Sequence, residues 1–261
     1  MADNLASSFA IQRRVLGALL MREILTRYGR HNIGFLWLFV EPMLFTLGVT
    51  ALWSLVQADK FSSLPIVAFA LTGYSSVLLW RSMPGRCLSA IGPNLSLLYH
   101  RNVRVIDLFI ARILLEAAGT TMSLVALSLL FIGFEAMGPP EDVLKVVEAW
   151  LLLGWFGAGL GLAIGSLAYD NELIDKIWHP MSYILFPLSG AAFLVSAVPA
   201  EAREILLLFP MVHGVEMLRE GWFGSAITAY YDVGYMAAVN AGLLLFGLLR
   251  LRAIADKVRP Q

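Results

Sequence analysis

Long apolar runs separated by short polar stretches dominate the chain. This pattern predicts an all-α integral membrane protein, because about 20 apolar residues in a helix cross the roughly 30 Å hydrocarbon core of a bilayer. All 261 residues, 1–261, then form a single transmembrane domain. Six transmembrane helices are expected, at residues 33–56, 65–81, 105–134, 146–168, 180–198 and 233–250.

Residues 9–31 form a predicted interface helix ahead of the first span. Apolar residues from Met21 onward recur at helical spacing on one face, and Arg22 and Arg27 fall on the other. Such a helix lies along a membrane surface, and we expect its basic face to point toward anionic headgroups. The residues before it are predicted to be a loose tail, and a change of apolar phase indicates a bend near residues 17–21 or burial on two sides.

Glu41 and Pro42 interrupt the first span well inside its apolar run. An acidic group at that depth costs about 2.5–3.5 kcal/mol on insertion scales. Pro42 lacks an N–H and leaves a carbonyl without its helical partner. We expect this face to point into the helix bundle or a wet cavity, although a protonated or locally bonded Glu41 explains the pattern equally well.

Two further patterns lie inside spans. Arg112 and Glu116 are four residues apart, which favours a structural ion pair near the membrane edge over substrate binding. Gly157, Gly161 and Gly165 also repeat every four residues and leave one helix face without side chains. A close-packing surface is the favoured interpretation, and a smooth gate is the alternative.

Two connecting regions stand out. Residues 82–104 are too polar to span a membrane and are long enough to hold short helices. Residues 199–232 include an apolar stretch that is too short to cross and is cut by Pro210 and Gly214. Irregular backbone at membrane depth is tolerated where protein or water surrounds it. We therefore expect a re-entrant region with two short helices before the last span.

The distribution of lysine and arginine sets the predicted orientation. The formal net charge is zero, and the 19 basic residues are spread unevenly over the two sides of a six-span chain. Basic residues concentrate on the side that holds both termini and residues 82–104, which predicts that this side is cytoplasmic. Residues 199–232 then face the periplasm, and the other basic residues on that side are Lys60 and Lys145.

The sequence lacks the motifs of a self-contained enzyme. No Gly-x-x-x-x-Gly-Lys-Ser/Thr loop is present, so the chain cannot bind ATP by that device. Its four histidines and one cysteine form no metal-ligand spacing. We expect no cofactor, no metal and no nucleic acid on this chain, and any ATP and Mg²⁺ on a separate ATPase subunit.

Three short motifs carry a resemblance to a known family: RYGR at 27–30, GFLW at 34–37 and EP at 41–42. Together they resemble the start of the first membrane helix in ABC-2-type polysaccharide export permeases, most of all the transmembrane subunit of capsular polysaccharide exporters. The resemblance implies a homodimer with two cytoplasmic ABC ATPase subunits in a bacterial, Gram-negative inner membrane. It also implies lipid-linked acidic polysaccharide as cargo, delivery to periplasmic or outer-membrane partners, and docking of the ATPase on residues 82–104.

Candidate functional residues follow from that hypothesis. A sugar ring packs on aromatic faces, and arginine matches carboxylate or phosphate bidentately. Interfacial aromatic belts and the positive-inside bias explain the same residues without a function. The candidate substrate path comprises Arg27, Arg30, Trp37, Glu41, Phe45, Tyr74, Trp80, Arg81, Tyr183 and Phe186. The candidate contacts to the ATPase are Pro84, Arg86, Pro93, Asn94, Tyr99 and Arg101.

Other functions remain open at this point. An exporter of O-antigen or teichoic-acid-type glycans fits the motifs nearly as well. A small-molecule ABC-2 exporter fits them less well, because it needs no cluster of basic residues at the cytoplasmic entrance. In this chain the cluster would be Arg27, Arg30, Arg81 and Arg86. An intramembrane enzyme that modifies glycolipids would need a clustered polar constellation, which the sequence does not display.

Overall fold

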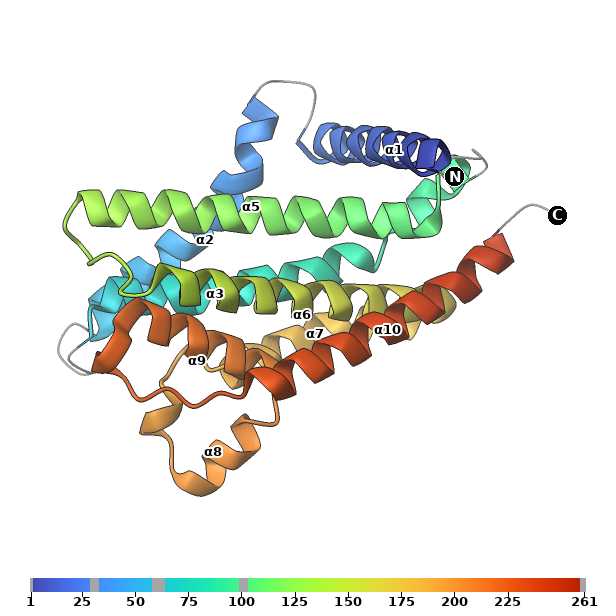
Figure 1. Ribbon diagram of the computed structural model, residues 1–261. Helices are drawn as coiled ribbons and strands as arrows, with labels where there is room; N and C mark the ends of the chain where they lie inside the picture. Colours follow the sequence, from blue (N-terminus) through green and yellow to red (C-terminus); the bar gives the residue numbers. More distant parts are fainter. Residues whose placement is uncertain (1, 29–32, 58–63, 99–102, 259–261) are drawn as a thin grey trace.

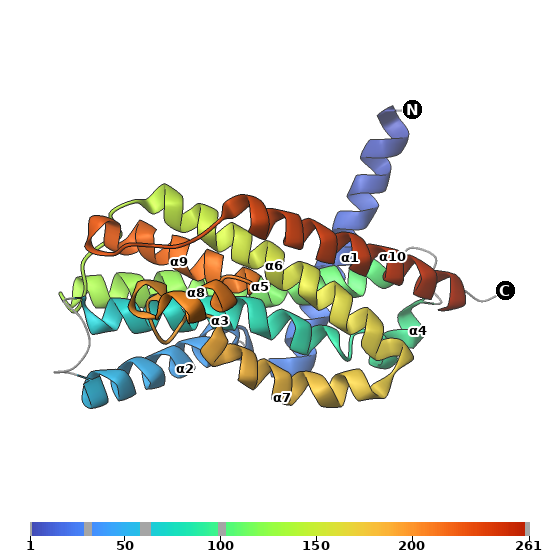
Figure 2. The same ribbon diagram turned by 90° about the horizontal axis from the view of Figure 1, so that it is seen from below.

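The computed structural model describes residues 2–28, 33–57, 64–98 and 103–258, and every regular element within these ranges is helical. The longer helices run side by side in one bundle (Figures 1 and 2). The elements are α1 (Ala2–Tyr28), α2 (Ile33–Gln57), α3 (Ile66–Cys87), η1 (Gly92–Asn94), α4 (Leu95–Leu98), α5 (Val105–Gly133), α6 (Val143–Asp170), α7 (Glu172–Leu188), η2 (Val195–Ala197), α8 (Ala200–Leu206), α9 (Pro210–Phe223), η3 (Gly224–Ala226) and α10 (Val233–Val258).

Helices α3 and α6 form the centre of the bundle. Trp80 of α3 is fully buried and lies 6.0 Å from the ring of Phe156 on α6, measured between ring centroids. Leu153 of α6 and Val215 of α9 complete the same core without exposed surface. The remaining long helices pack around this pair, whereas α1 crosses the direction of the bundle (Figure 2).

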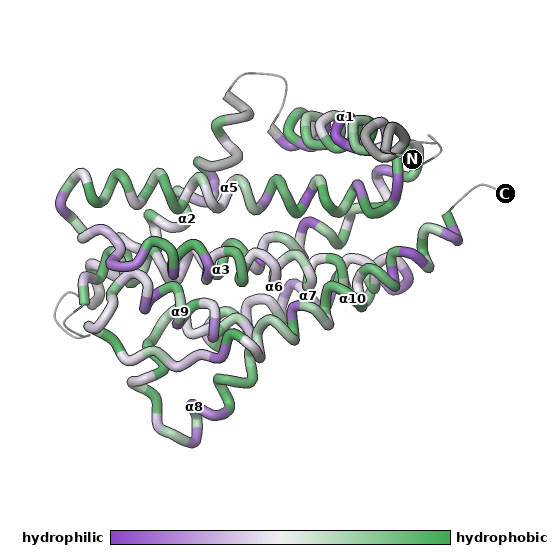
Figure 3. Tube along the Cα trace, viewed as in Figure 1, coloured by the Kyte–Doolittle hydropathy of each residue, from purple (hydrophilic) through white to green (hydrophobic). Residues whose placement is uncertain are grey.

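Four helices in the described part of the chain, α3, α5, α6 and α10, are long and apolar enough to cross a membrane. Helix α2 adds a shorter apolar stretch, Val40–Leu55. Hydrophobic positions line most of α5, and hydrophilic positions gather toward helix ends (Figure 3). The protein is therefore a multi-span helical membrane protein.

Helix α3 continues past its predicted end at Arg81. Pro84 lies within the helix, and Leu88 N–H donates to the carbonyl of Pro84 at 3.1 Å. The predicted boundary was wrong because polar residues need not end a helix when neighbouring helices supply partners for them. The first residues of the predicted connecting region 82–104 thus belong to α3.

Helix α7 begins eight residues before the predicted start at 180 and ends well before 198. Asn171 caps the helix by accepting a hydrogen bond from Leu173 N–H at 2.9 Å, a contact that outweighs the Pro180 signal. The helix stops at Leu188, and Gly190 then adopts a positive φ of 76° that most residues avoid. Pro180 therefore lies inside the helix instead of opening it.

The N-terminal helix is longer than expected and continuous. It starts at Ala2, so the predicted loose tail is wrong, and no bend interrupts residues 17–21. Burial on two sides does not explain the change of apolar phase either, because the later apolar positions Met21 and Leu25 are exposed. Leu19 packs against α5, while the charged face of α1 also turns inward. Residues 29–31 of the predicted interface helix lie outside the described residues.

The glycine repeat of α6 lies against α3. A Cβ atom at Gly157 would lie 2.9 Å from Trp80 Cα, and one at Gly165 would lie 2.7 Å from the backbone oxygen of Cys87. Gly161 is less crowded, with its nearest neighbour, the Sγ of Cys87, at 3.3 Å. The two helices approach closely because no side chain separates them along this line.

Two short helices, α8 and α9, occupy the predicted re-entrant region, and two buried charged residues of α9 bond the backbone of the segment between α7 and α8. Arg219 donates to the carbonyls of Gly190 and Phe193, each at 2.6 Å, and its guanidinium lies 3.8 Å from the centroid of the Phe69 ring. Glu216 accepts from the N–H of Val195 at 3.3 Å. Each of these contacts holds α9 against the segment that follows α7.

Candidate substrate pocket and its ion-pair network

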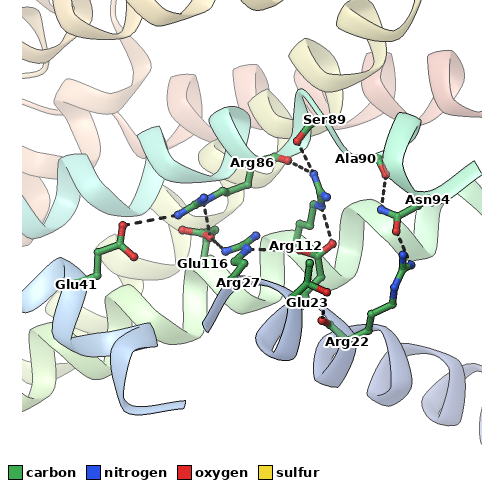
Figure 4. Close-up of polar contacts among 11 residues, drawn as sticks. Arg22, Glu23, Arg27, Glu41, Arg86, Ser89, Ala90, Asn94, Arg112 and Glu116 are labelled. Atoms are coloured by element: carbon green, nitrogen blue, oxygen red, sulfur yellow. Dashed lines mark hydrogen bonds and ion pairs between the residues drawn. The ribbon is translucent and has the colours of Figure 1, made fainter. Parts of the chain in front are cut away.

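The charged face of α1 points into the bundle, contrary to the expectation that it meets lipid headgroups. Arg22 Nη1 lies 2.5 Å from the side-chain oxygen of Asn94, and Arg27 pairs with Glu116 of α5. The apolar residues Met21 and Leu25 are exposed instead. The amphipathic pattern located both faces but assigned them the wrong surroundings, because the partners of the charged face lie far away in the sequence (Figure 4).

Arg112 forms the second link between α1 and α5. Its Nε donates to Glu23 at 3.0 Å, and its Nη1 donates to the Arg86 carbonyl at 2.6 Å and to Ser89 Oγ at 3.0 Å. The predicted pair between Arg112 and Glu116 does not form, because each residue has a closer partner on another helix. A guanidinium that is almost fully buried is stabilised only when such partners satisfy it.

Glu116 and Arg86 carry these contacts on toward α2. Arg86 Nε lies 3.2 Å from the Glu116 carboxylate, and Arg86 Nη2 lies 3.8 Å from the carboxylate of Glu41 (Figure 4). The two carboxylates therefore share one guanidinium. We call the whole set the charged network; its members are Glu23, Arg27, Glu41, Arg86, Arg112 and Glu116.

A pocket of about 420 Å³ opens next to the charged network, between α2, α3, α5 and α7. Its volume lies in the usual range for small-ligand sites, and both charged and aromatic side chains line it. Arg81 lies over the Tyr183 ring at 4.1 Å from its centroid, and its Nε donates to Ser182 Oγ at 3.2 Å. The pocket is lined by Glu41, Pro42, Phe45, Leu78, Arg81, Ser82, Gly85, Arg86, Leu115, Glu116, Gly119, Thr120, Trp178, His179, Ser182 and Tyr183.

Part of the predicted substrate path comes together in this pocket. Glu41, Phe45, Arg81 and Tyr183 all line it. Glu41 therefore faces a cavity, one of the two surroundings expected for an acidic group at that depth. These four residues come from α2, α3 and α7, so only the folded chain brings them into one place.

The remaining path residues lie elsewhere. Tyr74 and Phe186 pack edge to face at a centroid distance of 6.1 Å, beside a small apolar cavity that Trp53 also lines. Trp80 is fully enclosed in the core of this chain, and Trp37 is exposed on α2. Arg27 belongs to the charged network, and Arg30 lies outside the described residues.

Some of the candidate contacts to the ATPase are buried or face the pocket, and others lie at the surface or outside the described residues. Pro84 and Arg86 lie in α3, where Pro84 is buried and Arg86 faces the pocket. Asn94 is buried and donates to the Ala90 carbonyl at 2.9 Å. Pro93 lies at the surface. Tyr99 and Arg101 lie outside the described residues.

Sequence reasoning missed several residues that line the pocket. Glu116 was noticed but given the wrong partner, and Trp178 and Ser182 were not singled out. The signal was present, because these two residues are four apart and share one face of α7. It was hidden because the predicted spans 146–168 and 180–198 left Trp178 outside any expected helix.

Membrane-length helices around a charged and aromatic pocket define a multi-span membrane protein with a candidate ligand site. The chain belongs to the ABC-2 type transporter family, whose sequence pattern matches residues 14–223. It is 48% identical over 254 residues to the capsule polysaccharide export inner-membrane protein CtrC of Neisseria meningitidis serogroup B, covering 97% of this chain and 96% of that protein.

Two other relatives have similar names and nearly the same coverage. The capsule polysaccharide export inner-membrane protein BexB of Haemophilus influenzae is 45% identical, again over 97% of this chain and 96% of its own length. The polysialic acid transport protein KpsM of Escherichia coli is 28% identical over 94% of this chain and 95% of its own length.

Proposed function

We propose that this chain is the transmembrane permease subunit of an ABC transporter that exports capsular polysaccharide across a bacterial inner membrane. The observation that carries the proposal is the similarity to CtrC and BexB, at 48% and 45% identity over nearly the full length of each protein. Both are named as inner-membrane proteins of capsule polysaccharide export. The cargo is proposed to be acidic polysaccharide carried on a lipid.

A separate ABC ATPase supplies the energy in this proposal. The sequence has no phosphate-binding loop of the Walker type, so ATP and Mg²⁺ belong on a partner subunit. Both described ends of the chain and α4 lie toward the same end of the bundle (Figure 1). This arrangement suits a cytoplasmic face that holds both termini and receives the ATPase near residues 82–104.

Export of a polymer requires a second copy of the chain. The pocket of about 420 Å³ holds a small ligand and is no passage for a polysaccharide. A two-fold homodimer would enclose a wider path between its copies, and two-fold dimers are the commonest closed assemblies. Six spans in each copy, with α2 and α7 as the additional crossings, place both termini on one side of the membrane.

Deletion and complementation test the proposal. A strain that lacks this chain should accumulate polysaccharide inside the cell and lose it from the surface, and a plasmid copy should restore surface polysaccharide. An ATPase subunit that carries the Walker phosphate-binding loop should also co-purify with this chain. Normal surface polysaccharide in the deletion strain would contradict the assignment, and catalytic modification of a glycolipid by the isolated chain would favour an enzyme.

A further inference from the structure

The charges around the pocket do not cancel. Glu116 lines the pocket and forms ion pairs with both Arg27 and Arg86. Arg86 is in turn shared with Glu41, at the longer distance of 3.8 Å. The charge of Arg27 offsets that of Glu116. Two further arginines line the pocket, Arg81 and Arg86, but only one further carboxylate does, that of Glu41. The pocket therefore carries an excess of positive charge.

Arg81 is the source of that excess. The described residues place no carboxylate within ion-pair distance of its guanidinium, and its defined contacts are the Ser182 hydroxyl and the Tyr183 ring. The guanidinium carbon lies 4.1 Å from the centroid of that ring, and among the described residues only its Nε has a hydrogen-bond partner, which leaves the terminal nitrogens for a ligand. A planar, oriented guanidinium is the side chain best suited to hold a carboxylate or a phosphate through two hydrogen bonds.

Aromatic rings with large exposed areas stand beside this arginine. Tyr183 is 66% exposed and Phe45 is 58% exposed, and both line the pocket. Trp178 also lines the pocket and is buried. An aromatic face packs against the C–H face of a sugar ring, while hydroxyls such as that of Ser182 and carboxylates such as that of Glu41 bond its hydroxyl groups.

We propose that this pocket binds a single acidic sugar unit, with Arg81 holding its carboxylate or phosphate and the exposed aromatic rings contacting the face of the ring. This inference rests on the proposed function and adds to it, because the pocket would select acidic over neutral glycan at a defined place in the chain. Arg86 is the second cation that the ligand meets, and Glu41 weakens binding because it competes with the ligand for Arg86.

Titration of small sugars by saturation-transfer NMR tests the proposal on the full chain in phosphatidylcholine nanodiscs. We expect D-glucuronic acid to bind at least about tenfold more tightly than D-glucose, the factor that one charge-assisted hydrogen bond supplies. Arg81→Gln should remove most of this preference, and Arg81→Lys should restore part of it. Glu41→Gln should tighten glucuronate binding, because it frees Arg86.

Arg250→Gln provides the matched control. Arg250 lies on α10, pairs with Asp170 and is not part of the pocket, so its loss should leave glucuronate binding unchanged. Equal binding of glucose and glucuronate, or unchanged binding in Arg81→Gln, would overturn the proposal. Displacement of glucuronate by equimolar inorganic phosphate would also overturn it in favour of a bare anion site, and displacement by phosphatidylglycerol in the nanodisc would overturn it in favour of a lipid headgroup.

The complementation assay keeps the two proposals separate. If export depends on this chain but Arg81→Gln exports normally and binds glucuronate normally, the pocket proposal fails and the proposed function stands. If the deletion strain exports capsule normally, the proposed function fails whatever the pocket binds. Glucuronate binding that is lost together with export in Arg81→Gln supports both.

Discussion

The contact between α3 and α6 gives a graded test of the structure. Replacing Gly165 by alanine would place a methyl group 2.6 Å from Phe109 Cε1 and 2.7 Å from the backbone oxygen of Cys87. Ordinary contacts between heavy atoms begin near 3.5 Å, so the two helices would have to separate by roughly 0.8 Å. The oxygen belongs to the backbone and cannot rotate away, unlike the end of a flexible side chain.

The expected destabilisation follows from these distances. Overpacking a core by one methyl group costs about 1–3 kcal/mol, and Gly165→Ala should lie near the upper value because it meets backbone. Gly161→Ala should cost less, since its nearest neighbours lie at 3.3–3.5 Å. Gly242→Ala on α10 meets nothing within 4 Å and should gain about 0.5–1 kcal/mol from the lower backbone entropy of alanine.

The measurement is the midpoint of thermal unfolding for purified GFP fusions, read as the fraction that remains monodisperse on size exclusion after heating. For a chain of this size, each kcal/mol of destabilisation lowers the midpoint of thermal unfolding by about 2–4 °C. Gly165→Ala should therefore lower the midpoint by roughly 5–10 °C, Gly161→Ala by less, and Gly242→Ala should raise it slightly. A Gly165→Ala variant as stable as Gly242→Ala would refute the close contact of α6 with α3.

Three further predictions follow from the buried polar contacts. Glu116→Gln leaves Arg27 and Arg86 without their shared carboxylate and should lower the thermal midpoint far more than Arg250→Gln, because buried pairs cost about 3–5 kcal/mol to break and surface pairs at most about 1 kcal/mol. Arg219→Leu removes the donor to the buried carbonyls of Gly190, Ala191 and Phe193, so well-folded protein should be nearly absent on size exclusion; a yield equal to wild type would count against these contacts. Asn94→Ala removes the partner of Arg22, so trypsin should cleave within α1 several-fold faster while α3 and α6 stay protected, and an unchanged cleavage rate would contradict the contact.

Features encoded locally could be read from the sequence. The apolar runs predicted helix positions to within a few residues for α2, α5 and α6. The glycine spacing on α6 located a face that lies against α3 in the structure. Glu41 was expected to avoid lipid, and it faces a cavity. In each case the signal lies within one helix, so no knowledge of distant partners is needed.

Features that depend on distant partners could not be read in this way. The direction of the charged face of α1 is set by Glu116 and Arg112, which lie about 90 residues further along the chain. The start of α7 is decided by a single hydrogen bond to Asn171, which competes with the stronger statistical signal of Pro180. The charge and helix propensity of a residue limit the contacts that it can make. Which of those contacts form depends on where its partners lie in the folded chain.

The charged network also suggests how motion at one end of the bundle reaches the pocket. Arg112 bonds the carbonyl of Arg86, and the Arg86 side chain reaches both Glu116 and Glu41 in the pocket wall. A shift of the last turn of α3, close to the proposed ATPase contact, would therefore move backbone and guanidinium together. Because Glu41 lies at the longer distance from Arg86, its contact is the first that such a shift would break, and an acidic ligand competes at that same point. In this arrangement ligand binding and movement of α3 act on one ion pair, so each would alter the free energy of the other.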